Sequence, residues 1–236
     1  MNRLSRWLPL FWVLLLIGVL RLVMDPIGSG LARFQIVGGV VVLWLGLLYF
    51  SRRRRWLFGI AVAVVALPGV FLLLPGRKPA VEILRASYLK NLQHYSGTPY
   101  VWGGENRRGI DCSGLVRQGL IDADLEIGLK TLNPHLLRRA ISMSWHDCSA
   151  KALRDGYGGY TRKLAQVAAI NTCDPSLLEP GNIAVTANGV HVLAYLGNSK
   201  WIQADPGAGK VVTSAPNDQG WFESPVVVME WRQLGE

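Results

Sequence analysis

The N-terminal part of the chain contains three long apolar stretches, and regular alternation of polar and apolar residues begins only after them. They cover residues 7–24, with Arg21 as the one charge inside, residues 34–50 and residues 56–74. Each is close to the roughly 20 residues that a helix needs to cross the apolar core of a bilayer. So many nearly continuous apolar residues exceed what the rest of the chain can cover in a soluble fold. The pattern therefore predicts a membrane anchor of three transmembrane helices over residues 1–78.

After residue 78 the hydrophobic period changes. Residues 79–95 carry apolar side chains at helical spacing, and the spacing returns at 112–120 after a glycine-rich break. Helical hints follow at 136–143 and 161–170 within a polar middle segment. Short β-type runs then alternate with Gly, Asn, Asp and Pro, at 182–187, 190–196, 201–204, 210–213 and 225–231. Helices followed by strands predict an α+β domain over residues 79–236, with an antiparallel sheet packed on the helix that begins at Cys112.

Charge is divided unevenly between these two parts. The first 78 residues hold ten Lys and Arg against one acid, Asp25, whereas the rest holds 15 basic and 15 acidic side chains. The whole excess of +9 therefore flanks apolar stretches, which is typical of membrane proteins and argues against a nucleic-acid partner.

The basic residues also predict an orientation. Arg3, Arg6 and the connector at 52–55 are expected on the cytoplasmic face, because cytoplasmic loops are enriched in Lys and Arg. Three crossings then leave residues 79–236 on the outer face, periplasmic or extracellular, of an inner or cytoplasmic membrane. If the first or second stretch does not cross, this conclusion is reversed.

Cys112 stands where the glycine-rich stretch gives way to the second helix, in the sequence Asp-Cys-Ser-Gly. A thiol attacks as its thiolate, and the N-terminus of a helix lowers a thiol pKa through its dipole and unpaired N–H groups. The same N–H groups can hold the oxyanion of a tetrahedral intermediate. Cys112 is therefore a candidate nucleophile, with a buried structural cysteine as the alternative.

His191 is the strongest candidate for the base that such a thiol needs. It opens a predicted strand, and Gln203 lies twelve residues further on, across a turn at 197–199. With a three-residue loop, Leu193 pairs with Gln203 and the two share a face of the sheet with His191 and its partner Asp205. A two- or four-residue loop sends Gln203 to the opposite face. The remaining histidines are weaker candidates: His94 lies on the first predicted helix of the domain, and His135 and His146 are expected at the surface.

Four sequence blocks together carry a family resemblance. They are PYVWGG at 99–104, DCSGL at 111–115, PGN at 180–182 and HVLAYLGNSKWIQA at 191–204. In order and spacing they resemble the NlpC-type family of papain-like cysteine peptidases, which cut peptide bonds in bacterial cell wall. The match extends over about residues 79–231. Two departures are Asn182, where the family usually has Asp, and a long segment at 122–179.

The resemblance implies a papain-like cysteine peptidase domain and assigns roles within it. Cys112 takes the place of the nucleophile, His191 that of the base and Gln203 that of the third polar residue. Tyr100 falls near the oxyanion site, and Asp111 falls where the family often binds a substrate amine. Ser113 is grouped with these two as an oxyanion or substrate-binding residue.

The predicted function is a membrane-anchored endopeptidase that hydrolyses amide bonds of peptidoglycan stem peptides, at the bond between D-glutamate and a diamino acid. One alternative is a papain-like thiol hydrolase or acyltransferase acting on another amide or ester. Another is a non-catalytic module that binds cell wall. No cofactor is expected, and no metal site, because the Cys and His residues lack zinc-ligand spacing.

The chain has an odd number of cysteines, three. In an oxidising compartment, one disulfide between Cys148 and Cys173 would leave Cys112 free. The equal alternative is that Cys148 and Cys173 are two separate small hydrophobic residues.

Overall fold

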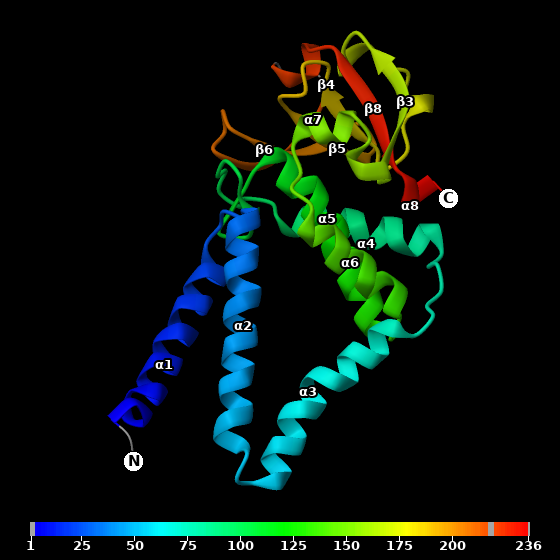
Figure 1. The fold of residues 1–236 in the computed structure, drawn as a ribbon. Helices are drawn as coiled ribbons and strands as arrows, with labels where there is room; N and C mark the ends of the chain where they lie inside the picture. Colours follow the sequence, from blue (N-terminus) through cyan, green and yellow to red (C-terminus); the bar gives the residue numbers. More distant parts are fainter. Residues whose placement is uncertain (1–2, 217–219, 236) are drawn as a thin grey trace.

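The computed structural model describes residues 3–216 and 220–235, and three long helices lead into an α+β domain (Figure 1). The helices are α1 (Arg3–Met24), α2 (Gly30–Ser51) and α3 (Arg55–Leu73). Each is long and apolar enough to cross a membrane, and very little of its surface is buried in the protein. The prediction of three long apolar helices is confirmed.

Helices α1 and α2 pack closely because small residues on α2 face large ones on α1. A side chain at Gly39 would clash with Val19, and one at Gly46 would clash with the ring of Trp12. The indole N–H of Trp12 donates to the carbonyl of Leu43 at 2.9 Å. Such small-residue contacts are typical of helix pairs in membranes, where the lipid adds no hydrophobic drive for association.

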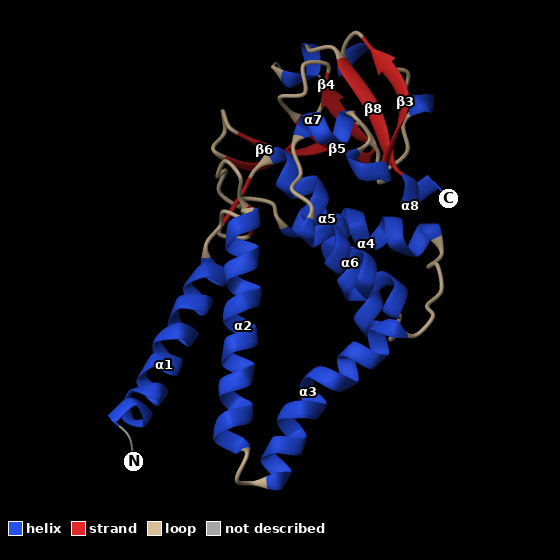
Figure 2. Ribbon diagram, viewed as in Figure 1, coloured by secondary structure: helices blue, strands red, loops and turns tan. Residues whose placement is uncertain are grey.

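The domain combines helices with an antiparallel sheet (Figure 2). The longer helices are α4 (Val81–His94), α5 (Cys112–Lys130) and α6 (Pro134–Trp145), and the short ones are α7 (Ala150–Arg154) and α8 (Arg232–Gly235). A small hairpin, β1 (Glu105–Asn106) and β2 (Gly109–Ile110), precedes α5. Within the described ranges, the larger sheet has the order β3-β8-β4-β5-β6-β7. Its strands are β3 (Thr161–Val167), β4 (Ile183–Thr186), β5 (Val192–Gly197), β6 (Lys200–Asp205), β7 (Lys210–Ser214) and β8 (Val226–Trp231).

The sheet has a hydrophobic core on each face, which follows from the two-residue period of its strands. On β5, Val192 and Ala194 join the core that contains α4 and α5. Leu193 and Tyr195, at the alternate positions, join a smaller core with Phe222. The first core fixes α5 against the middle of the sheet, and with it the position of Cys112.

One predicted element is wrong. Residues 161–170 carried a helical hint, but Thr161–Val167 forms the edge strand β3, paired antiparallel with β8 from Thr161 opposite Trp231 to Val167 opposite Val226. Its exposed and partly buried positions largely alternate, as they do in an edge strand with one face to solvent. Pairing with β8 outweighed the weak local helical pattern.

Candidate active site

Asp111 caps the helix that begins with Cys112. Its Oδ1 accepts hydrogen bonds from the N–H of Gly114 at 2.6 Å and from the hydroxyl of Ser113 at 2.9 Å. Its Oδ2 accepts from the N–H of Gly103 at 2.9 Å. A carboxylate at an N-cap satisfies free N–H groups and complements the helix dipole, which stabilises the helix by about 1 kcal/mol. These bonds set the start of α5 and therefore the place of the thiol.

The Cys112 sulfur lies against the chain on both sides of His191. It is 4.0 Å from the carbonyl oxygen of Val190, and the N–H of Val192 also faces it. The β5–β6 ladder ends at Ala194 and Ile202, so the N–H of Val192 lies beyond the last paired position. The structure thus brings the sulfur to the strand entry that carries His191.

His191 and Gln203 form a buried pair. The Nε2 atom of His191 lies 2.7 Å from Oε1 of Gln203, and the two residues are only 2% and 3% exposed. Because an amide oxygen only accepts hydrogen bonds, Nε2 carries the proton and Nδ1 keeps the lone pair. The ring is also held by Trp221, which stacks on it at 4.2 Å and 15°. The imidazole is therefore fixed in one tautomer and one plane.

The predicted turn between these two strands is partly wrong. The loop has two residues, Asn198 and Ser199, both with positive φ as a type I′ hairpin requires. A bulge at Leu196 adds the missing residue, so that Ala194 pairs with Ile202 in the register that a three-residue loop would give. The side chains of His191 and Gln203 meet for this reason, although the ladder itself stops before the expected pair of Leu193 and Gln203.

The electrostatics of the thiol differ from the prediction. Burial, together with the nearby Asp111 carboxylate, raises the pKa of Cys112 to about 12, although the N–H groups of Val192, Ser113 and Cys112 itself act in the opposite direction. The expectation of a lowered thiol pKa is therefore wrong for this state, because desolvation outweighs the helix N-terminus. Burial also lowers the pKa of His191, although its hydrogen bond with Gln203 acts to raise it. The pair is a neutral thiol and a neutral imidazole.

A comparison with known proteins identifies the domain that holds this pair. The model of the NlpC/P60 family matches residues 97–230, more than half of the chain and all of the elements described above as the site. The chain belongs to the NlpC/P60 family. The predictions of this family, of a papain-like α+β fold and of a cysteine peptidase domain are confirmed.

Two curated relatives and one solved structure illustrate the similarity. A protein of Haemophilus influenzae named "Probable endopeptidase" is 31% identical over 143 residues, which are 60% of this chain and 72% of that protein. "Probable endopeptidase NlpC" of Escherichia coli K12 is 29% identical, over 53% of this chain and 65% of that protein. The structure of the peptidoglycan hydrolase RipB from Mycobacterium tuberculosis has a TM-score of 0.41 and 20% identity, over 72% of this chain and 87% of that one. The chain thus spans about two thirds of the length of the Escherichia coli relative.

The other residues predicted for the NlpC/P60 site lie around the thiol. Burial raises the pKa of Tyr100 to about 12, with Cys112 and Asp111 as further causes, so its hydroxyl remains a donor beside the sulfur. Ser113 is buried and turns its hydroxyl to Asp111 and, at 3.3 Å, to the carbonyl of Cys148. Asp111 uses both oxygens for the cap described above. Its predicted contact with a substrate amine stays a prediction.

Two contacts of the site were missed from the sequence. Trp221 precedes the last strand and carries no motif, so only the folded chain reveals its stacking on His191. The Oγ1 atom of Thr186 accepts a hydrogen bond from the backbone N–H of His191 at 2.9 Å. The histidines expected at the surface take no part in the pair, and the ring of His146 bonds instead to the carbonyl of Ser142.

The predicted disulfide is not formed. Cys112, Cys148 and Cys173 are all free thiols. Cys148 packs on the core that contains α5, whereas Cys173 follows a 3-10 turn whose Ile170 belongs to the core on the other face of the sheet. The sheet thus separates the two cysteines, and the alternative of two separate small residues holds. Within the described ranges no group of three or more His, Cys, Asp or Glu is placed to hold a metal ion.

Proposed function

We propose that this chain is a membrane-anchored cysteine endopeptidase that hydrolyses amide bonds in peptidoglycan stem peptides, at the bond between D-glutamate and a diamino acid. The observation that carries this proposal is the buried pair of His191 and Gln203 beside the sulfur of Cys112. A module that only binds cell wall has no use for a thiol and an oriented imidazole in contact with the same strand entry. The names of the two curated relatives, both probable endopeptidases, support cleavage of a peptide bond.

In the proposed reaction, the Cys112 sulfur attacks the carbonyl carbon of the amide while Nδ1 of His191 takes the thiol proton. The Oε1 atom of Gln203 stabilises the imidazolium that forms. The N–H of Cys112 and the Tyr100 hydroxyl donate to the oxyanion. When the C–N bond breaks, His191 returns the proton to the leaving nitrogen. Water, deprotonated by the same imidazole, then attacks the acyl carbon, the C–S bond breaks, and the imidazolium returns its proton to the leaving sulfur.

The test of this function is mass spectrometry of fragments that the purified protein releases from peptidoglycan. We expect fragments that end in D-glutamate together with peptides that begin with the diamino acid, and no release by the Cys112→Ala variant. Release at another position would retain the enzyme class and change the bond. Turnover of an unrelated ester or amide, with intact peptidoglycan, would contradict the proposal.

The proposal includes an anchor over residues 1–78, a peptidase domain over residues 79–236, and a position of that domain on the outer face. The turn between α2 and α3 holds Arg52, Arg53 and Arg54, and it lies at the end of the helices far from the domain (Figure 1). The turn between α1 and α2 and the end of α3 lie on the domain side. This arrangement supports a basic cytoplasmic turn with the domain across the membrane.

Two single-cysteine variants test the orientation in a background without native cysteines. Lys200 is exposed at the start of β6, next to the β5–β6 turn, and Arg53 lies in the basic turn. A membrane-impermeant maleimide should label Lys200→Cys in intact cells stripped of their wall and should label Arg53→Cys only after lysis. Labelling in the reverse pattern would place the domain in the cytoplasm.

The raised pKa of Cys112 leads to a prediction for its alkylation. Since only the thiolate reacts, the rate with iodoacetamide should rise about tenfold for each pH unit between about pH 6 and pH 9, with no plateau. Mass spectrometry of the Cys112 peptide measures this rate, and free glutathione provides the reference. A plateau that is already reached near neutral pH would show a thiolate–imidazolium ion pair and would contradict the neutral resting pair.

A further inference from the structure

The turn between α1 and α2 pairs with the segment that precedes the nucleophile. The N–H of Glu105 donates to the carbonyl of Pro26 at 2.8 Å, and the N–H of Gly28 donates to the carbonyl of Gly103 at 3.3 Å. Between these two bonds, Ile27 and Gly104 form an antiparallel bridge. The end of the apolar hairpin is thus joined to the peptidase domain as a short strand.

The same segment holds the cap of the nucleophile helix from its other side. The N–H of Gly103 donates to Oδ2 of Asp111, and the N–H of Asp111 donates to the carbonyl of Gly104 at 3.1 Å. A side chain at Gly104 would collide with the backbone of Gly109, and one at Gly114 would collide with the carbonyl of Gly104. Two hydrogen bonds, from Gly28 to Gly103 and from Gly103 to Asp111, therefore connect the hairpin turn to the residue that caps the helix of Cys112.

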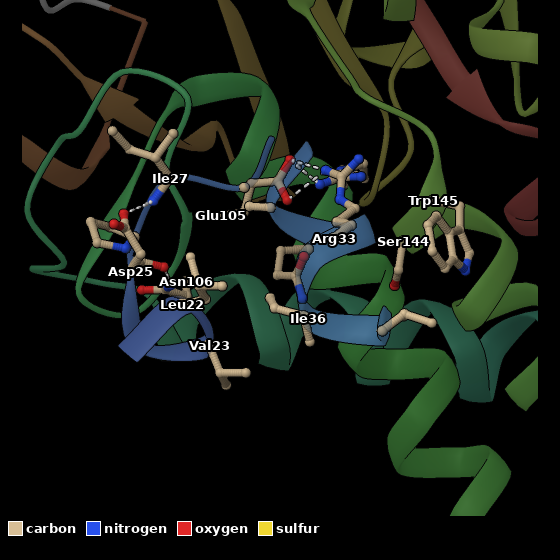
Figure 3. Close-up of a pocket in the computed structure, with 16 residues that line it drawn as sticks. Leu22, Val23, Asp25, Ile27, Arg33, Ile36, Glu105, Asn106, Ser144 and Trp145 are labelled. Atoms are coloured by element: carbon tan, nitrogen blue, oxygen red, sulfur yellow. Dashed lines mark hydrogen bonds and ion pairs between the residues drawn. The ribbon is translucent and has the colours of Figure 1, made fainter. Parts of the chain in front are cut away.

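An ion network built on the buried side chain of Arg117 fixes this joint. The Nη2 atom of Arg33, on α2, donates to both carboxylate oxygens of Glu105, at 2.9 Å each (Figure 3). Glu105 also pairs with Arg117 of α5, which is only 1% exposed and donates to the carbonyls of Met143 at 3.1 Å and His146 at 2.7 Å. Removing the Glu105 carboxylate would leave the buried charge of Arg117 without its ion-pair partner, which is strongly unfavourable.

Apolar contact at this joint is partial: the ring of Phe34, on α2, lies 5.5 Å from that of Trp145, on α6. A cavity of about 480 Å³ lies between the hairpin and the domain, lined on one side by Leu22 and Ile36 and on the other by Gln118 and Trp145 (Figure 3). The strand pairing, the Arg33–Glu105 ion pair and this ring contact hold the hairpin in place.

We infer that Arg33 and Glu105 are positioning residues for the nucleophile, so that the anchor hairpin forms part of the active geometry in addition to tethering the domain. Docking of the hairpin sets the path of residues 103–105, this segment sets Asp111, and Asp111 sets the start of α5 at Cys112. For hydrolysis, this inference rests on the function proposed above. When the ion pair is broken, the cap loosens and the sulfur loses its fixed approach to the substrate.

The experiment uses the full chain in detergent micelles with Arg33→Ala, Arg33→Lys and Glu105→Gln. The matched control is Arg138→Ala, because Arg138 joins the other end of the anchor to the domain. It donates to the carbonyls of Leu72 and Leu74, on the α3 side, and does not touch the segment at 103–111. The measurements are amide hydrogen exchange of residues 103–114, the alkylation rate of Cys112, and kcat and KM for release of stem-peptide fragments.

Arg33→Ala and Glu105→Gln should each speed exchange at residues 103–114 and change the alkylation rate at least about threefold, because the cap and the burial of the sulfur are altered. They should lower kcat about tenfold with KM nearly unchanged, as expected when the position of a reacting group is disturbed. Arg33→Lys should restore part of kcat, and Arg138→Ala should resemble the wild type.

The inference is overturned if exchange and alkylation in Arg33→Ala and Glu105→Gln equal the wild type, or if Arg138→Ala has the same effect as they do. If the wild type releases no stem-peptide fragments, the proposed function fails. Exchange and alkylation still decide the inference in that case, because neither needs a substrate. If Glu105→Gln does not fold, the Arg33→Lys and Arg33→Ala pair gives the answer, since Arg33 lies outside the domain.

Discussion

Replacing Cys112 with alanine should lower kcat/KM for release of stem-peptide fragments by at least about a thousandfold. The reason is that the sulfur is the atom proposed to bond to the substrate carbonyl, and no other nucleophile lies in its place. The neighbouring hydroxyl, on Ser113, already donates to Asp111 and is buried. The measurement is the initial rate of fragment release, with the fold checked by circular dichroism.

Cys173→Ala is the control for this variant. Cys173 is also a free thiol, but it belongs to a turn on the opposite face of the sheet, so its loss should leave the rate within about twofold of the wild type. A Cys112→Ala protein that keeps substantial activity would remove Cys112 from the reaction, whatever the family membership. Equal losses in both variants would point to oxidation or misfolding instead of catalysis.

The sequence predicted the nucleophile helix well because the signal is local. An Asp before the first turn is a strong N-cap, and the glycines around it allow backbone approaches that side chains would prevent. The register of His191 and Gln203 was predicted only on condition of a three-residue loop, and the structure reaches the same register with a two-residue loop and a bulge. The bulge at Leu196 was not predictable, because it compensates a turn whose length the sequence alone left open.

What the sequence missed depends on contacts between distant segments. Strand β3 is held by its pairing with β8, about 65 residues further along the chain, and not by its own pattern. The raised pKa of Cys112 depends on how deeply the thiol is buried, whereas the backbone N–H groups of Val192, Ser113 and Cys112 give only the opposing effect. The contacts of Arg33 with Glu105 and of Trp221 with His191 join residues that no motif relates.

These corrections change the expected resting state of the site. A thiol at the N-terminus of a helix suggests a stored thiolate, whereas the folded site favours the uncharged pair. Transfer of the proton to His191 then has to accompany attack on the substrate, and the geometry of the imidazole becomes more important than its charge. Gln203 and Trp221 fix that geometry, one by a hydrogen bond and the other by stacking.

His191→Ala should therefore lower kcat/KM by roughly a thousandfold, within the range that a positioned general base contributes. Gln203→Ala keeps the imidazole and removes only its partner, so its loss should be smaller. Both variants leave the thiol in place, and mass spectrometry after alkylation verifies that Cys112 is intact. Equal losses in the two variants would indicate that the imidazole works only when Gln203 holds it.

The pH dependence separates a base from a structural role for His191. Burial lowers the pKa of His191, so the neutral, proton-accepting ring is present above that pKa and is lost as pH falls through it. Wild-type kcat/KM should accordingly stay near its maximum at neutral pH and fall only below about pH 6.5, the ordinary value for histidine. In His191→Ala the plateau near neutral pH should disappear, and the residual rate should rise continuously with pH, because the thiol, with a pKa of about 12, then has to lose its proton to solvent. A profile that keeps both the plateau and the acidic fall in His191→Ala would assign the proton transfer to another group, and His191 would then be a packing residue next to the sulfur.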